Sequence, residues 1–225
     1  MNNEKIGQHI LVFLGRYSIH LDTIILSWLV MGILVLGSWL ITRNLEKMPR
    51  TGQNIVETLV EFLQKLLEDN MSPEGQSAFP YLATLFLFIL FSNLLGVIPG
   101  LLVPELKSPT GDLNVTFGLA LVVFLLSQGY AIRARGLPAY LLSFFRPNPL
   151  FLPLNLVEIV TRPLTLAFRL FGNIFAGEVL LLILYFLVPV VIPSLWAAFS
   201  VFIGVIQAYL FVMLAIAYIS SAVEE

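Results

Sequence analysis

The sequence contains no cysteine and only two histidines, His9 and His20, both near its beginning. Without cysteine the chain has no disulfide, no thiolate metal site and no cysteine nucleophile. The position of the two histidines argues against a histidine metal centre or a Ser-His-Asp triad in the body of the chain. We therefore expect the protein to use neither a metal nor a cofactor.

Charged residues are also scarce, at 12% of the 225 residues, whereas a soluble domain has about 25%. Hydrophobic residues make up 58% of the chain, and its mean hydropathy is +0.92. This composition indicates an all-α polytopic membrane protein, with residues 1–225 as a single membrane domain. The net charge of −2 offers no basic excess for a nucleic-acid partner. The first residues lack the apolar core and cleavage site of a signal peptide.

Three apolar runs in the first two thirds of the chain are each long enough to cross a bilayer as a helix, which takes about 20 residues. They cover residues 21–42, 78–98 and 114–132. The second run is expected to end before Pro99. Basic residues follow the first and third runs, at Arg43, Lys47 and Arg50 and at Arg133 and Arg135. Because such residues favour the cytoplasmic side, we expect segment 1–20 to lie outside.

Residues 52–70 show a different pattern, with apolar residues at steps of three and four and polar residues between them. This periodicity predicts an amphipathic helix. We expect the helix to lie on the cytoplasmic surface of the membrane. The alternative is a connector helix that packs on the protein itself.

The last third of the chain predicts two long helices, over residues 150–188 and 193–221, separated by Pro189 and Pro193. At 1.5 Å per residue the first would be roughly 57 Å long, against a hydrocarbon core of about 30 Å. It must therefore tilt steeply, break, or run partly along the surface, and Pro163 is the expected kink. The two helices form a hairpin that places the C-terminus in the cytoplasm.

Four charged residues interrupt this apolar hairpin: Glu158, Arg162, Arg169 and Glu178. Each costs about 2.5–3.5 kcal/mol at a helix centre, so such residues are rare and usually functional. At about 100° per residue, the first three share one stripe with Asn173, whereas Glu178 lies about 180° from Arg169 and cannot pair with it. Glu158 and Arg162 are also spaced for an i, i+4 ion pair.

The last helix carries a weaker polar stripe that includes Ser200 and Gln207. An antiparallel hairpin could bring Gln207 level with Arg169. Structural alternatives exist for these residues too. Arg169 could be half of a buried ion pair, and Asn173 and Gln207 could be interhelical hydrogen-bond partners.

Three polar residues outside the hairpin have structural interpretations. We interpret Asn93 and Asn114 as helix-end polar groups and not as ion ligands. Asp112 directly precedes the third apolar run, where an aspartate caps a helix by accepting a hydrogen bond from its first turn.

The segment RPLTLAFRLFGNIFAGE, residues 162–178, closely resembles the a subunit of the rotary F-type ATP synthase. The similarity extends to FLFILFSNLLGVIPG, DLNVTFGLAL, LPLNLVEIVTRPL and IQAYLFVMLAIAYISSA. The Arg-Leu-Phe-Gly-Asn motif, with a glutamate five residues later, is its most specific part. The resemblance implies a membrane stator that faces a ring of c subunits, with peripheral-stalk b subunits and lipid as further partners.

The resemblance also implies roles for individual residues. Arg169 matches the intramembrane arginine that faces the acidic residue of each passing c subunit. The outer half-channel is lined by positions that match Asn173, Glu178, Ser200 and Gln207. Glu158 is the candidate for the cytoplasmic half-channel. Many relatives carry a titratable group at the position of Ser200, so here the relay would depend on Glu178 and water.

The function so implied is ion translocation coupled to rotor turning in a bacterial plasma membrane, without covalent catalysis on this chain. The choice between H⁺ and Na⁺ is made on another chain. Two other classes stay open. One is an independent ion channel or secondary transporter, against which the absence of an inverted repeat counts. The other is a structural anchor for a peripheral stalk.

Overall fold

The apolar runs of the sequence form helices, because only a helix satisfies its own backbone hydrogen bonds inside a membrane. In this computed structural model the described residues are 11–14, 17–43, 51–73, 75–102, 108–145, 148–188 and 191–224. Five of the helices among them are long and apolar enough to cross a membrane. They are α1 (Leu21–Thr42), α3 (Phe79–Leu102), α4 (Leu113–Arg135), α6 (Leu152–Leu187) and α7 (Val191–Glu224). The predicted all-α polytopic fold is confirmed.

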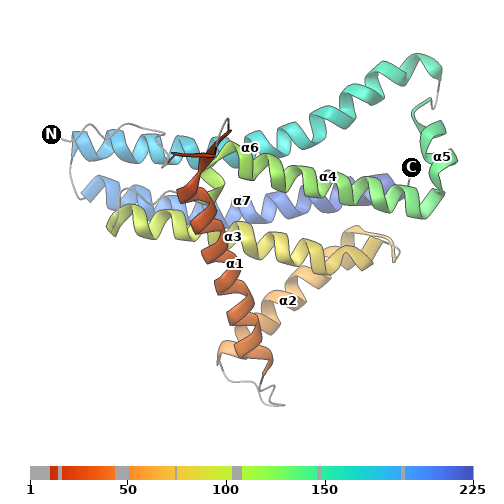
Figure 1. The fold of residues 1–225 in the computed structure, drawn as a ribbon. Helices are drawn as coiled ribbons and strands as arrows, with labels where there is room; N and C mark the ends of the chain where they lie inside the picture. Colours follow the sequence, from red (N-terminus) through yellow and green to blue (C-terminus); the bar gives the residue numbers. More distant parts are fainter. Residues whose placement is uncertain are drawn as a thin grey trace.

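Four of these helices form the bundle, and the fifth crosses it. Helices α3, α4, α6 and α7 run along one another, and α1 crosses their direction steeply (Figure 1). Helix α7 packs against α3, α4 and α6, and α4 packs against α6. The core is built from buried apolar side chains of α2, α3, α4, α6 and α7, among them Leu82, Ile89, Leu166, Leu170, Phe211, Ile216 and Ile219.

The predicted amphipathic helix is α2 (Thr51–Asn70), which packs against α3 and α7. Its Leu63 and Leu67 are each 2% exposed and belong to the core of the bundle. Ile55 and Phe62 stay 65% and 48% exposed on the same helix. Helix α2 thus packs on the protein through one part of its apolar face and leaves another part uncovered, so its placement on the membrane surface stays a prediction.

Several short elements were not predicted from the sequence. Strands β1 (Leu11–Leu14) and β2 (Tyr17–His20) form an antiparallel hairpin before α1. Single-turn helices η1 (Gly75–Ala78), η2 (Pro109–Gly111) and η3 (Pro149–Phe151) and the short helix α5 (Leu137–Ser143) join the long helices. Each contains too few residues to give a periodic signal.

Helix α3 also differs from expectation, since it continues through Pro99 to Leu102. A proline removes its own N–H bond and its ring crowds the carbonyl four residues earlier, but α3 still extends past it by part of a further turn. Helix α7 begins before Pro193, which lies in its first turn, where an N–H has no partner inside the helix.

Helix α6 is continuous over 36 residues, with Pro163 inside it. At 1.5 Å per residue it is about 54 Å long. Because the helix is continuous, it does not break in order to fit within the hydrocarbon core. Figure 1 shows that α6 begins apart from the other helices and runs beside α4 and α7 further along. This brings the polar residues in its second half into the bundle.

Candidate functional site

Arg169 lies on the face of α6 that points away from the bundle. Its neighbours Leu166, Ala167 and Leu170 are at most 1% exposed and pack inward, whereas Arg169 is exposed. Within the described residues, Arg169 forms no hydrogen bond and no ion pair. The alternative of a buried structural ion pair is therefore wrong for the described part of the chain. An unpaired cation on a membrane helix calls for a partner outside this chain.

Asn173 and Gln207 join α6 to α7. The side-chain amide of Asn173 donates a hydrogen bond to Oε1 of Gln207, which is 1% exposed. Gln207 therefore lies level with Asn173, one helical turn beyond Arg169 on α6. The two helices are offset along their axes, and periodicity within each helix cannot reveal that offset. Nε2 of Gln207 is buried and has no hydrogen-bond partner among the described residues.

A cavity of about 270 Å³ opens between α3, α6 and α7 beyond this pair. We call it the large cavity. Its polar lining comes from four parts of the chain: Asn93, Ser108, Asn173, Glu178 and Ser200. A water molecule occupies about 30 Å³ in the liquid, so the cavity has room for several. Three residues that the sequence singled out, Asn173, Glu178 and Ser200, thus line one hydratable space.

A network of buried hydrogen bonds forms part of the wall of the large cavity, at Asn93 and Ser108. Thr110 Oγ1 donates to Asn93 Oδ1 at 2.8 Å, and Asn93 Nδ2 donates to the carbonyl of Gly204 at 3.0 Å. Ser108 Oγ donates to the carbonyl of Ser92 at 2.9 Å. The interpretation of Asn93 as a helix-end group is wrong, since it is 2% exposed and bridges α3, η2 and α7. The sequence indicated this bridging role of Asn93 only by placing a single amide side chain within an apolar run.

The single turn η2 lies against the carboxylate of Glu178. A Cβ built on Gly111 would be 3.1 Å from Oε1 of Glu178, which is closer than most real contacts of that kind. A glycine at this position therefore lets the backbone of η2 approach the carboxylate. Neither the sequence pattern nor the family resemblance had pointed to Gly111.

Asp112 caps α4, as the sequence predicted. Its carboxylate accepts a hydrogen bond from the backbone N–H of Asn114 at 2.8 Å, from Thr23 Oγ1 at 3.0 Å and from His20 Nδ1 at 2.6 Å. Burial would raise the pKa of Asp112, but these hydrogen bonds and the charge on His20 outweigh it and lower that pKa below its ordinary value. The cluster also ties the beginning of α1 to η2 and α4.

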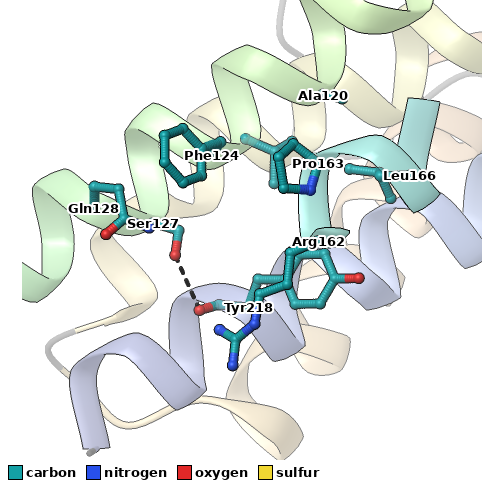
Figure 2. Close-up of a pocket in the computed structure, with 9 residues that line it drawn as sticks. Ala120, Phe124, Ser127, Gln128, Arg162, Pro163, Leu166 and Tyr218 are labelled. Atoms are coloured by element: carbon teal, nitrogen blue, oxygen red, sulfur yellow. Dashed lines mark hydrogen bonds between the residues drawn. The ribbon is translucent and has the colours of Figure 1, made fainter. Parts of the chain in front are cut away.

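The polar residues in the first half of α6 form a second cluster. Arg162 Nη2 lies 2.6 Å from Oε1 of Glu158, so the expected i, i+4 ion pair is present. Arg162 Nη1 also donates to Ser221 Oγ at 3.2 Å, and the guanidinium lies 5.5 Å from the ring centre of Tyr218. Beside it is a space of about 10 Å³ between α4, α6 and α7 (Figure 2). We call this the small cavity.

Arg169 stands between the two cavities. Helix α6 contributes Arg162, Pro163 and Leu166 to the small cavity, and residues from Asn173 onward to the large one. The gap from Leu166 to Asn173 is roughly 10 Å along the axis, and Arg169 lies within it. No residue of this gap lines either space.

Comparison with known proteins matches most of the chain to the family that its sequence motifs resemble. The family described as ATP synthase A chain matches residues 24–220. The ATP synthase subunit a of Desulforamulus reducens is 42% identical over 213 residues, which cover 90% of this chain and 79% of that protein. The ATP synthase subunit a 1 of Crocosphaera subtropica is 42% identical over 204 residues, covering 90% and 86%. That of Moorella thermoacetica is 39% identical over 203 residues, covering 90% and 91%.

The chain belongs to the ATP synthase A chain family. As a member of that family it is an integral, non-catalytic subunit of the membrane sector. All six candidate residues, from Glu158 to Gln207, fall inside the matched range, and so do Asn93 and Ser108. His20, which bonds to the cap of α4, falls outside it.

Proposed function

We propose that this chain provides two offset half-channels, which carry protons to and from the carboxylates of a c-subunit ring and so couple proton flow to rotor turning. The observation that carries this proposal is the position of Arg169 between two cavities, where it is exposed and has no partner in the part of the chain that the structure describes. In this assignment the large cavity belongs to the outer half-channel, with Asn173, Glu178 and Ser200 in its wall. Glu158 belongs to the cytoplasmic half-channel.

The chemistry of arginine suits this position. A guanidinium does not give up its proton in a protein, so Arg169 is a permanent cation. A proton that tried to pass directly from one cavity to the other would meet that charge. A cation within reach also favours the ionised form of a carboxylate. A rotor carboxylate facing Arg169 therefore releases its proton to one half-channel, and takes up a new one from the other after moving past.

The walls of the two spaces have matching roles. Glu178 is the titratable group in the wall of the large cavity. Ser200 can hydrogen-bond to water beside it but does not take up or release a proton. Gln207 acts indirectly, because its oxygen fixes the amide of Asn173 at the inner end of the cavity. Glu158 is 51% exposed, which suits a group that exchanges protons with the cytoplasm.

The remaining surface of the chain suits the other proposed partners. Most of the apolar side chains of α1 are exposed, among them Trp28, Val35 and Trp39. We assign this surface to lipid and to the membrane helices of peripheral-stalk b subunits. The basic residues that follow α1 and those in the last turn of α4 support a cytoplasmic C-terminus and an outer N-terminus in a bacterial plasma membrane.

The test is ATP-driven acidification of inverted vesicles that carry the whole complex, with Arg169→Ala compared with wild type. We expect pumping to be lost and a passive proton leak to appear, while c subunits still co-purify. Arg133→Ala is the matched control, since it removes an exposed arginine at the end of α4, and we expect it to pump normally. Normal pumping by Arg169→Ala would overturn the proposal. Proton transport by the purified chain without c subunits would instead indicate an independent channel.

A further inference from the structure

One buried carboxylate joins the beginning of α1 to the turn η2, close to where α4 begins (Figure 1). Asp112 directly follows η2 and is 3% exposed. Its Oδ1 accepts hydrogen bonds from the backbone and the side chain of Asn114 on α4. Its Oδ2 accepts hydrogen bonds from His20 and Thr23 at the beginning of α1. Asp112 therefore caps α4 through one oxygen and holds α1 through the other.

The bonds to α1 go beyond what a helix cap requires. An asparagine caps a helix about as well as an aspartate, because one side-chain oxygen is enough. Here Oδ2 has two donors of its own, His20 Nδ1 at 2.6 Å and Thr23 Oγ1 at 3.0 Å. A buried carboxylate is tolerated only where its oxygens are hydrogen-bonded. These two donors therefore fix Asp112, and the turn that precedes it, relative to α1.

The turn η2 carries this position to Glu178. A Cβ built on Gly111 would be 3.1 Å from Oε1 of Glu178, so the backbone at Gly111 lies against the carboxylate. One peptide bond joins Gly111 to Asp112. The turn also packs against α3 and α6. A shift of Asp112 would therefore move the backbone that lies beside Glu178.

We propose that His20 is a positioning residue of the outer half-channel, and that it holds η2 against the carboxylate of Glu178 through its hydrogen bond to Asp112. The inference rests on the proposed function, in which Glu178 takes up protons from the outer side. The described lining of the large cavity does not include His20, so His20 acts on proton entry through η2. Both donors to Oδ2, His20 and Thr23, precede the family match, which begins at residue 24.

The test measures ATP synthesis by the whole complex in vesicles whose lumen corresponds to the outer side, with assembly checked by co-purification of c subunits. A fixed potassium diffusion potential drives synthesis at constant bath pH, while the lumenal pH is varied. His20→Leu removes the bond to Asp112, and we expect proton entry to slow about tenfold, the effect of one lost hydrogen bond to a charged group. A tenfold higher proton concentration offsets this loss, so the lumenal pH at half-maximal rate should fall by about one unit.

Three further variants serve as comparisons. His20→Asn places an amide nitrogen at the position of Nδ1, so it keeps the donor and should restore the wild-type half-maximal pH. Thr23→Val removes the other donor at nearly constant size and should shift the half-maximal pH in the same direction as His20→Leu. Tyr130→Phe is the matched control, since it removes the hydrogen bond with Ser77 elsewhere on α4, and it should follow wild type.

The comparison of leucine with asparagine separates the hydrogen bond from the charge of a histidine. Both replacements lack the imidazole. The acidic side chains around this link, among the described residues, are Asp22 in the first turn of α1, Asp112 and Glu178. All three stay in every variant. A difference between His20→Leu and His20→Asn therefore arises from the donor to Asp112.

The inference is overturned if His20→Leu and Thr23→Val keep the wild-type half-maximal pH, even where the maximal rate falls. It is also overturned if His20→Asn shifts as far as His20→Leu, or if the shift appears when the bath pH is varied instead. Arg169→Ala in the same vesicles tests the proposed function separately. If it abolishes synthesis while the His20 variants follow wild type, only the positioning role fails. If it still synthesises ATP, the half-channels themselves are refuted.

Discussion

Replacing Gly96 with alanine should push η2 away from the wall of the large cavity. A Cβ on Gly96 would lie 2.4 Å from Cβ of Ser108, 2.9 Å from its Oγ and 3.1 Å from its Cα. Rotation of the serine side chain cannot relieve this contact, since Cβ and Cα do not move with that rotation. The backbone of η2 must shift, and the bonds from Ser108 to Ser92 and from Thr110 to Asn93 move with it.

The magnitude follows from these contacts. Overpacking a filled site costs about 1–3 kcal/mol. Two weakened hydrogen bonds add about 0.5–1.5 kcal/mol each. We therefore expect Gly96→Ala to destabilise the protein by about 3 kcal/mol. Ser108→Gly removes the clashing Cβ, so in that background the alanine should cost about 2 kcal/mol less, a coupling energy typical of residues in contact.

The assay is the thermal midpoint of the purified complex, read from the loss of ATP-driven pumping after reconstitution. Gly96→Ala should lower the midpoint clearly, and the double variant should fall close to Ser108→Gly alone. Gly118→Ala on α4, where a Cβ would meet nothing within 4 Å, is the control and should not lower the midpoint. Additive effects of the two substitutions would refute the reasoning, because the cost would not then arise from their contact.

Two further predictions concern the acidic residues. Because the folded pKa of Asp112 is lowered, its carboxylate stabilises the fold above its unfolded pKa of about 3.9, and this is lost as the pH falls through the folded value. The difference in thermal midpoint between wild type and Asp112→Asn should therefore narrow below about pH 4, and a constant difference would contradict this. Glu178→Gln keeps the size of the side chain but cannot titrate, so ATP-driven acidification should fall about tenfold or more. Val179→Ala should pump normally, and a fully active Glu178→Gln would exclude a relay there.

Features that depend on one helix were predictable from the sequence. The spacing of Glu158 and Arg162 led to their ion pair, and the 180° separation led to the absence of a pair between Arg169 and Glu178. Asp112 was recognised as a cap because its bond to Asn114 spans two residues. In each case a few residues of regular helix fix the geometry.

Features that depend on how helices meet were not predictable. Asn93 bonds to a residue 17 positions away and to another 111 positions away, and no local pattern contains either contact. The hydrogen bond between Asn173 and Gln207 depends on the axial offset between α6 and α7, which is set by side-chain packing. Gly96 and Gly111 gave no signal, since close approach of a backbone becomes visible only when both segments are in place.

The unequal volumes of the two spaces have an electrical consequence. Water in a space of about 270 Å³ raises the local dielectric constant, whereas the small cavity holds at most one molecule. Under the proposed function, we therefore expect a membrane potential to fall mainly across the drier stretch of α6, between Arg169 and the Glu158–Arg162 pair. Of the roughly 2.3 kcal/mol that 100 mV supplies per charge, most acts on that stretch. In the proposed orientation, the membrane potential acts mainly on proton transfer in the cytoplasmic half-channel. Water in the large cavity exchanges protons with the outer medium, so a rotor carboxylate beside it meets nearly the outer pH.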